Sequence, residues 1–285
     1  MSWPAYHGPE TRDGAKIRGN PGDRDFSMPP ITASATLKED APTVFITGAN
    51  RGIGLELARQ YATRGWNVIA TSRHPVGHGG LAAVQALAAD HSQLRVERLD
   101  VTDTAMIRGV AAKYRDQPID VLINNAANVE TTFAADIAHA NQTYDEIDFD
   151  AARRDFDVNS LGPMRVAQAF MPNVERSKQK KVVNVTSYGG SFGQPLPGAH
   201  AMNYGASKAA LNKYSVLLSI AMKPKGVIVA LVQPIFVASK TDLANMTGAA
   251  PLEQEVAKLI QTIERMTMDS AGKITNFQTG KTDPF

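Results

Sequence analysis

The hydrophobic pattern divides the 285-residue chain into an unpatterned beginning and a long, regular remainder. From Thr43 onward, short apolar runs alternate with stretches in which apolar residues recur every three or four positions. Continuous runs predict strands buried on both faces, and the wider spacing predicts amphipathic helices. We therefore expect strands at 43–47, 67–71, 94–99, 121–124, 181–186 and 227–232, and helices at 53–64, 81–91, 104–115, 151–174 and 203–222.

Strands that alternate with helices in this way are typical of an α/β fold with a doubly wound sheet. We expect a Rossmann-type parallel sheet of about seven strands with helices on both faces, and ligands at the carboxyl ends of the strands. The final segment, GKITNFQTGKTDPF, predicts a hairpin of two short strands around the turn at 278–280.

The first forty or so residues show no such periodicity, because prolines and glycines alternate there with scattered charges. We predict that residues 1–41 form a disordered extension and that residues 42–285 form one domain with both the cofactor and the substrate sites. The extension has no apolar stretch typical of a secretory signal. Its acids argue against a mitochondrial presequence, whereas its arginines leave an organellar address open, so we expect a cytoplasmic protein with that alternative.

Composition excludes several classes of function. The chain has no cysteine, which excludes disulfides, thiolate metal sites and cysteine nucleophiles. Its net charge of +2 comes from interleaved acids and bases, so we expect no nucleic-acid partner. The longest apolar run, 226–237, is interrupted by Gln233 and Pro234 and is too short to span a bilayer, so we expect no membrane segment. The six histidines show no metal-binding spacing, and we expect no metal site.

A glycine-rich turn lies between the first predicted strand and the first predicted helix, in the sequence TVFITGANRGIGLELARQYATRGWNVIATSR. Glycines permit tight backbone geometry there, and the free N–H groups at the start of a helix favour an anion. Glycines also occur in turns for purely structural reasons, but the strand before and the helix after favour a pyrophosphate site. The predicted cofactor-binding residues of this turn are Gly48, Asn50, Arg51, Gly52, Ile53 and Gly54.

The end of the second strand indicates which dinucleotide binds. Sites for NAD usually offer an acidic residue there to the ribose hydroxyls, whereas this strand is followed by Arg73 with no acid nearby. Arg51 lies at a helix N-terminus, where a cation is unfavourable by roughly 0.3–1 kcal/mol unless an anion compensates it. Both arginines could be ordinary solvated residues of turns. Because two of them flank the same expected 2′-phosphate, we favour NADP(H).

Several spaced motifs together resemble the classical short-chain dehydrogenase/reductase (SDR) family, over the whole chain from Thr43 onward. They are Thr47–Gly54 for TGxxxGxG, Leu99–Asp103 for the segment whose Asp contacts adenine, Asn124–Ala127 for NNAG, Asn159 in FDVNSLGP for the helix-interrupting Asn, and Tyr204–Lys208 for YxxxK. The resemblance implies further cofactor contacts from Asp100, Val101, Asn125, Ala126, Tyr204, Lys208, Pro234, Val237 and Ser239, with Thr241 the alternative to Ser239.

The chain departs from the family pattern at two positions. Ala127 replaces the last glycine of NNAG, which adds only a methyl group. Ile235 follows Pro234 where the family usually has Pro-Gly, and a β-branched residue there disfavours the positive φ that glycine allows. The loop on the nicotinamide side is therefore expected to take a different path.

The pair Tyr204 and Lys208 can be interpreted chemically, since residues four apart share one face of a helix. An ammonium beside the phenol would lower the pKa of Tyr204 from about 10 toward neutrality and make it a usable acid. The ordinary alternative is a packed tyrosine and a solvated lysine. Ser187 ends a strand and could donate a hydrogen bond to a substrate oxygen, with Ser191 as its rival. By resemblance, Asn159 completes the catalytic set by holding a water that links Lys208 to solvent.

These residues predict an NADPH-dependent oxidoreductase that transfers hydride between nicotinamide and a small ketone, aldehyde or alcohol. TSYGGSF and the last segment of the chain resemble the C-factor/sniffer-type carbonyl reductases.

The alternative is an NADP(H)-binding regulator or a nonredox enzyme on the same scaffold, which Ile235 and the polar insert at 128–150 motivate. The resemblance also implies a homodimer or homotetramer through helices 151–174 and 203–222, although monomeric relatives exist.

Overall fold

The structure is a computed structural model that describes residues 37–73, 82–128, 144–194, 201–234 and 251–285. The chain divides into two units, Met1–Ala33 and Ser34–Phe285, and everything described belongs to the second. Most of the predicted disordered extension, residues 1–36, lies outside the described residues. The segment just after them lies against the second strand, because the side chain of Asn67 accepts a hydrogen bond from the Lys38 amide and donates one to its carbonyl, each at 2.8 Å.

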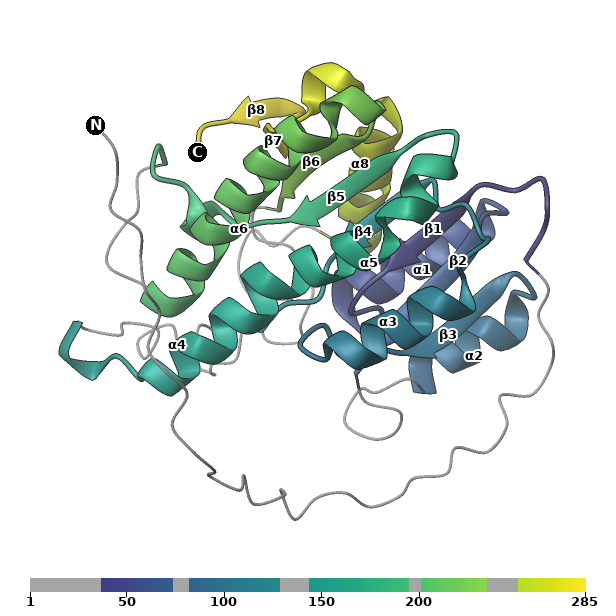
Figure 1. Cartoon of the computed structure of the whole chain (residues 1–285), viewed down its shortest axis with the longest axis horizontal. Helices are drawn as coiled ribbons and strands as arrows, with labels where there is room; N and C mark the ends of the chain where they lie inside the picture. The colour runs from purple at the N-terminus through teal and green to yellow at the C-terminus, as the bar shows by residue number, and fades with distance from the viewer. Residues whose placement is uncertain (1–36, 74–81, 129–143, 195–200, 235–250) are drawn as a thin grey trace, which may run out of the picture. The chain divides into compact units, whose positions relative to one another are not determined.

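Eight strands form one sheet in the order β3-β2-β1-β4-β5-β6-β7-β8 (Figure 1). The first seven pair in parallel, and β8 pairs antiparallel to β7. The predicted doubly wound parallel sheet is confirmed, and the eighth strand comes from the predicted C-terminal hairpin. The strands are β1 Thr43–Ile46, β2 Asn67–Ser72, β3 Leu94–Arg98, β4 Val121–Asn124, β5 Lys181–Val185, β6 Ile228–Gln233, β7 Ile274–Asn276 and β8 Lys281–Asp283.

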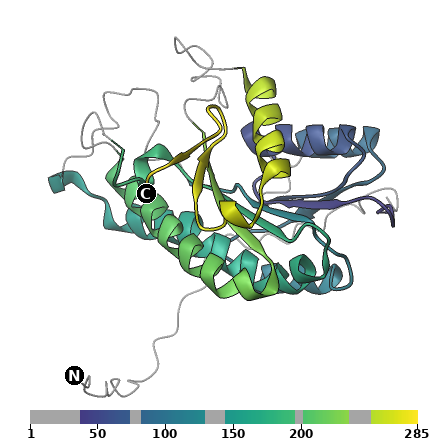
Figure 2. The same cartoon turned by 90° about the horizontal axis from the view of Figure 1, so that it is seen from above.

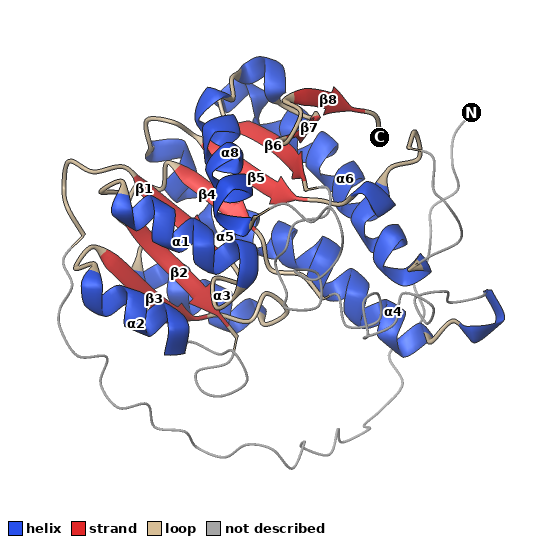
Figure 3. Ribbon diagram, turned by 180° about the vertical axis from the view of Figure 1, so that it is seen from behind, coloured by secondary structure: helices blue, strands red, loops and turns tan. Residues whose placement is uncertain are grey.

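Helices cover both faces of the sheet, as the views from above (Figure 2) and from behind (Figure 3) show. One layer contains α1 Gly52–Thr63, α2 Ala82–Asp90 and α8 Leu252–Arg265, and the other contains α3 Thr104–Lys113, α5 Gly162–Arg176 and α6 Met202–Met222. Alternate residues of β1 serve the two layers: Val44 and Ile46 pack in the core with α1 and α8, whereas Phe45 contacts Phe170 of α5 with ring centroids 4.3 Å apart. This alternation is the two-residue period of a strand buried on both faces.

The predicted helix at 151–174 consists of three segments. These are α4 (Phe149–Phe156), a π-helical turn η3 (Asp157–Leu161) and α5. Wide turns of this kind are rare and occur frequently at functional sites. Asn159 lies in the middle of the turn, where the family pattern places its helix-interrupting asparagine. Among the described residues, no helix is long and apolar enough to cross a membrane.

Candidate active site

The glycine-rich turn after β1 is fastened to the segment after β4 by side chains. The hydroxyl of Thr47 accepts hydrogen bonds from the amides of Asn125 and Ala126, both at 3.0 Å. The side-chain amide of Asn125 donates in return to the carbonyls of Thr47 and Gly48, again at 3.0 Å. The predicted cofactor residues Gly48, Asn125 and Ala126 are therefore held together, and Thr47, which the motif argument gave no role, connects them.

Close packing explains why glycine is required inside this turn. A Cβ at Gly54 would lie 2.2 Å from the carbonyl oxygen of Gly48 and 2.6 Å from the side-chain nitrogen of Asn125, distances that no real Cβ shows. Gly48 itself has a φ of +67°, a conformation that side chains disfavour. The first turn of α1 can thus pack against the residues that follow β1 only because Gly54 has no side chain.

The N-terminus of α1 fits a phosphate group. Its N-cap is Arg51, no side chain caps it, and its first turn carries no acidic residue. The first amides of a helix lack partners within the helix, and such amides bind anions well. The exposed Arg51 adds a positive charge, while Ile53 packs against the core and Asn50 is half-buried. The residues present are compatible with the pyrophosphate of a dinucleotide.

A second basic group lies at the ends of β2 and β3. Arg73 directly follows β2, and Arg98 ends β3 opposite Ser72. The Nε of Arg98 donates a hydrogen bond to the backbone carbonyl of Arg73 at 3.3 Å, and both side chains are exposed. Arg98 was not among the predicted residues. It could have been found only from the pairing of β2 with β3, which places it beside the end of β2.

The remaining predicted cofactor residues also follow strands. Asp100 comes after β3, and its side chain accepts hydrogen bonds from the amide and hydroxyl of Thr102 at 2.9 and 2.7 Å. Val101 is buried, and Pro234 directly follows β6. Val237 and Ser239, together with the departure at Ile235 and the alternative Thr241, lie outside the described residues.

The structure brings Ser187, Tyr204 and Lys208 together. The side chains of Ser187 and Tyr204 are hydrogen-bonded, and the Nζ of Lys208 lies 5.7 Å from the centroid of the Tyr204 ring. Lys208 is buried and donates to the carbonyl of Val185 at 2.9 Å. Ser191 instead donates to the carbonyl of Pro284 at 2.8 Å. Of the two candidate serines, the structure thus places Ser187 beside the tyrosine.

Two glycines allow the loop after β5 to approach helix α6. Ser187 is the N-cap of a short 3₁₀ turn, η4 (Tyr188–Gly190). A Cβ on Gly190 would lie 2.7 Å from the Cβ of Lys208, and one on Gly205 would lie 2.7 Å from the carbonyl oxygen of Gly189. Backbone therefore packs directly on backbone here, which sets the separation between Ser187 and the helix that carries Tyr204. The motif argument did not assign these glycines a role.

Asn159 is linked to the catalytic helix through Ser207. Its buried side chain accepts from the Asn128 amide at 2.7 Å and donates to the Asn128 carbonyl at 3.1 Å and to the Ser207 hydroxyl at 3.0 Å. Ser207 then donates to the backbone carbonyl of Tyr204 at 2.7 Å. Asn159 thus fixes both the segment after β4 and the first turns of α6. Neither Asn128 nor Ser207 was predicted, because both act through partners distant in sequence.

The electrostatics correct one expectation. Burial raises the pKa of Tyr204 to about 12; the hydrogen bond from Ser187 opposes this shift and the charge of Asp155 adds to it. Burial also lowers the pKa of Lys208 to about 8. The expected lowering of the Tyr204 pKa is therefore wrong for this structure, because loss of solvent around the phenol outweighs the hydrogen bond from Ser187. Tyr204 is accordingly a neutral phenol with a proton to donate.

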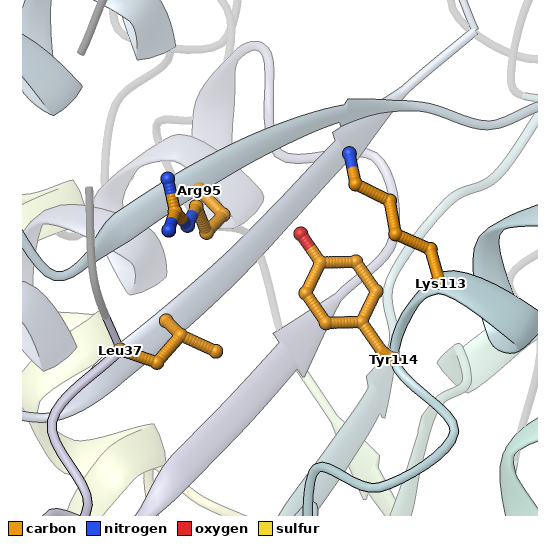
Figure 4. Close-up of a pocket in the computed structure, with 4 residues that line it drawn as sticks. All are labelled: Leu37, Arg95, Lys113 and Tyr114. Atoms are coloured by element: carbon orange, nitrogen blue, oxygen red, sulfur yellow. The ribbon is translucent and has the colours of Figure 1, made fainter. Parts of the chain in front are cut away.

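A cavity of about 360 Å³ lies elsewhere, on β3 and the end of α3 (Figure 4). Leu37, Arg95, Lys113 and Tyr114 line it, and both Lys113 and Tyr114 bond to the carboxylate of Glu97. None of these residues belongs to the catalytic group or to the dinucleotide turn. Within the described ranges, no three acidic or histidine side chains gather in a way that could hold a metal ion.

Comparisons with known proteins agree with this architecture. The family model of the short chain dehydrogenases matches residues 42–250, and this chain belongs to that family. An uncharacterised oxidoreductase of Schizosaccharomyces pombe is 32% identical over 241 residues, which are 82% of this chain and 90% of the relative. As a member of the family, the protein is an oxidoreductase that exchanges hydride between a nicotinamide cofactor and a CH–OH or C=O group.

Two solved structures have the same fold. The NADPH-bound carbonyl reductase from chicken fatty liver superposes with a TM-score of 0.74 at 24% identity, over 86% of this chain and 99% of its own. The carbonyl reductase Sniffer of D. melanogaster superposes with a TM-score of 0.73 at 20% identity, over 86% of this chain and 100% of its own. These likenesses establish the arrangement of strands and helices.

Proposed function

We propose that this protein is an NADPH-dependent carbonyl reductase that reduces the ketone or aldehyde group of a small molecule. The observation that carries the proposal is the hydrogen-bonded pair of Ser187 and Tyr204 beside the buried Lys208. This group follows β5 at the same edge of the sheet as the N-terminus of α1. A proton donor and a dinucleotide site at one edge are what a carbonyl reduction requires.

Each side chain has a defined part in the chemistry. NADPH, when bound, supplies the hydride for the carbonyl carbon. Tyr204 transfers its phenolic proton to the carbonyl oxygen, so its O–H bond breaks as the O–H bond of the product alcohol forms. Ser187 donates a hydrogen bond to the same oxygen and stabilises the negative charge that develops on it. The ammonium of Lys208 stabilises the resulting tyrosinate until solvent returns a proton.

The preference for NADPH rests on the basic side chains at the cofactor end of the site. Arg51 and Arg73 are both exposed, and Arg98 adds a third cation that contacts the Arg73 backbone. No acidic residue lies within β2 or at Arg73, where an NAD site would need one. The NADPH bound by the chicken carbonyl reductase supports the same preference. A cytoplasmic location, with the organellar alternative, and a homodimer or homotetramer remain predictions.

The direct experiment is a titration of the purified protein with NADPH and with NADH, followed by absorbance at the nicotinamide band with a pooled panel of ketones and aldehydes. We expect tighter binding of NADPH and an oxidation rate that depends on the panel. Tight binding without oxidation by any member would instead support the regulator or the nonredox enzyme. Failure to bind either nucleotide would contradict the proposal altogether.

Replacing the arginines tests the cofactor preference separately. In Arg51→Gln and Arg73→Gln, the KM for NADPH should rise about tenfold each, since a hydrogen bond to a charged group contributes roughly 1.5–3 kcal/mol. The KM for NADH should rise much less, because NADH shares the pyrophosphate but has no 2′-phosphate. Arg153→Gln is the control, as that exposed arginine pairs with Asp150 on α4. Equal weakening of both nucleotides would mean that the arginines do not contact a 2′-phosphate.

A further inference from the structure

Helix α4 carries a buried carboxylate for which the proposed chemistry has no role. Asp155 is 0% exposed, although burying a carboxylate is costly unless its oxygens are well bonded. Its Oδ1 accepts a hydrogen bond from the side chain of Asn128 at 2.7 Å. A leucine would fill such a place at lower cost, so the acid calls for a physical reason.

The first reason is mechanical. Asp155 and Asn159 lie one turn apart and hold the same residue: Asp155 accepts from the side chain of Asn128, and Asn159 bonds its backbone amide and carbonyl. From Asn159 the hydrogen bonds continue through Ser207 to the backbone carbonyl of Tyr204. We call this series the Asn128 clamp. It connects the buried carboxylate to the backbone that carries the catalytic phenol.

The second reason is electrostatic. Among the described residues, three groups with charge or a proton to share face Tyr204, each from a different element: Ser187 from the cap of η4, Lys208 from α6 and Asp155 from α4. A nearby negative charge disfavours a second one, so Asp155 raises the pKa of Tyr204 in the same direction as burial does. Ser187 acts in the opposite direction. The balance leaves the phenol protonated.

We propose that Asp155 is a positioning residue: by holding the Asn128 clamp from α4, it fixes the segment after β4 and, through Asn159 and Ser207, the backbone that carries Tyr204. The proposal rests on the proposed function, in which Tyr204 is the proton donor. The carboxylate of Asp155 also raises the pKa of Tyr204 in the same direction as burial, so removing its charge should be visible in the titration of the phenol. Reduction declines once Tyr204 has lost its proton, because the tyrosinate has none to give.

The test uses an isosteric variant and follows the phenol directly. In Asp155→Asn the charge is lost, but the amide oxygen can still accept from Asn128. The protein is labelled with ¹³Cζ-tyrosine, the Tyr204 signal is assigned with Tyr204→Phe, and its chemical shift is followed through an alkaline titration without cofactor. We expect tyrosinate to form at lower pH in Asp155→Asn than in the wild type. An unchanged titration of Tyr204 would overturn the electrostatic half of the proposal.

Asp157→Asn is the matched control. It removes the same charge two residues along, where the carboxylate pairs with Arg165 at 2.6 Å and is 40% exposed. Its Tyr204 signal should titrate as in the wild type. If Asp157→Asn moved the titration as far as Asp155→Asn, the effect would come from net charge and not from the buried position of Asp155.

A second variant, Asn128→Ala, keeps the charge and breaks the clamp. Its turnover at neutral pH should fall about tenfold or more, since small misplacements of catalytic groups are costly, and the Tyr204 titration should stay near that of the wild type. Turnover equal to the wild type would overturn the positioning half. The titration needs no activity, so a wild type without Tyr204-dependent reduction would refute the proposed function while the Asp155 result still stood.

Discussion

The turn after β1 and the loop after β5 both lie at the carboxyl edge of the sheet, but different contacts hold them. The first depends on the absence of side chains at Gly48 and Gly54, with Thr47 and Asn125 fastening the backbone. The second presents side chains, Ser187 and the facing Tyr204, and uses glycine only where η4 touches α6. The binding end is thus shaped by backbone, and the reacting end by the side chains that η4 and α6 present to each other.

This difference indicates how each region should respond to change. An added methyl group should damage the binding end by closing the turn. At the reacting end, removal of one hydroxyl or a small displacement of η4 should stop turnover and leave cofactor binding largely intact. The two regions can therefore be separated by measuring cofactor affinity and turnover on the same variants.

Gly54→Ala should have the largest effect on the binding end. The new Cβ would lie 2.2 Å from the Gly48 oxygen, so the turn must open. We expect a loss of stability of about 1–3 kcal/mol or more and loss of measurable NADPH binding. The control is Gly109→Ala in α3, where no atom lies within 4 Å and alanine should stabilise by roughly 0.5–1 kcal/mol. Normal NADPH affinity in Gly54→Ala would contradict the backbone account of this turn.

Gly190→Ala should affect the reacting end. Its Cβ would lie 2.7 Å from the Lys208 Cβ, so η4 and Ser187 must move away from Tyr204. We expect kcat to fall about 100-fold with little change in NADPH affinity. Gly189→Ala is the control, because its Cβ would meet its nearest neighbour at an ordinary 3.8 Å. Equal kcat values for the two variants would show that the η4–α6 contact does not set the catalytic geometry.

The most gradual predicted effect is the pH dependence of stability that comes from Lys208. Its pKa is about 8 in the folded protein against 10.5 for an ordinary lysine. Between these values the unfolded chain binds a proton that the folded chain does not, so the free energy of unfolding rises with pH. The rise is at most about 1.4 kcal/mol per pH unit and vanishes below the folded pKa.

Denaturant titrations without cofactor from about pH 7 to pH 10 measure this slope. Lys208→Met should lack the contribution, so the difference in unfolding free energy between wild type and variant should grow across that window. Parallel curves would mean that Lys208 keeps its ordinary pKa in the folded protein.

The sequence was sufficient to predict most of the fold, because strands buried on both faces are continuous apolar runs. The starts of β1 to β5 coincide with the predicted ones, and β6 begins one residue later. The apolar pattern of 151–174 predicted one continuous helix and missed the π turn inside it. A π turn adds about one residue to a single turn, which barely changes the spacing of the apolar residues. The asparagine motif around Asn159 was the signal that marked it.

Site residues could be predicted from the sequence only where a short local motif marks them. Tyr204 and Lys208 are one helical turn apart, and Ser187 follows a strand. Asp155 and its partner Asn128 are 27 residues apart, so only the folded chain reveals their bond. The predicted direction of the Tyr204 pKa shift was wrong for the same reason. The shift comes mainly from burial, which depends on the folded chain and cannot be inferred from the spacing of Tyr204 and Lys208.

The most direct test of the central claim compares the wild type with Tyr204→Phe, which removes a single oxygen. Both proteins are first shown to bind NADPH, and its oxidation is then followed with the same pooled ketones and aldehydes. The account predicts oxidation by the wild type and a loss of about 10²–10⁴-fold in the variant at unchanged NADPH affinity. Undiminished turnover in Tyr204→Phe would contradict the assignment of Tyr204 as the proton donor.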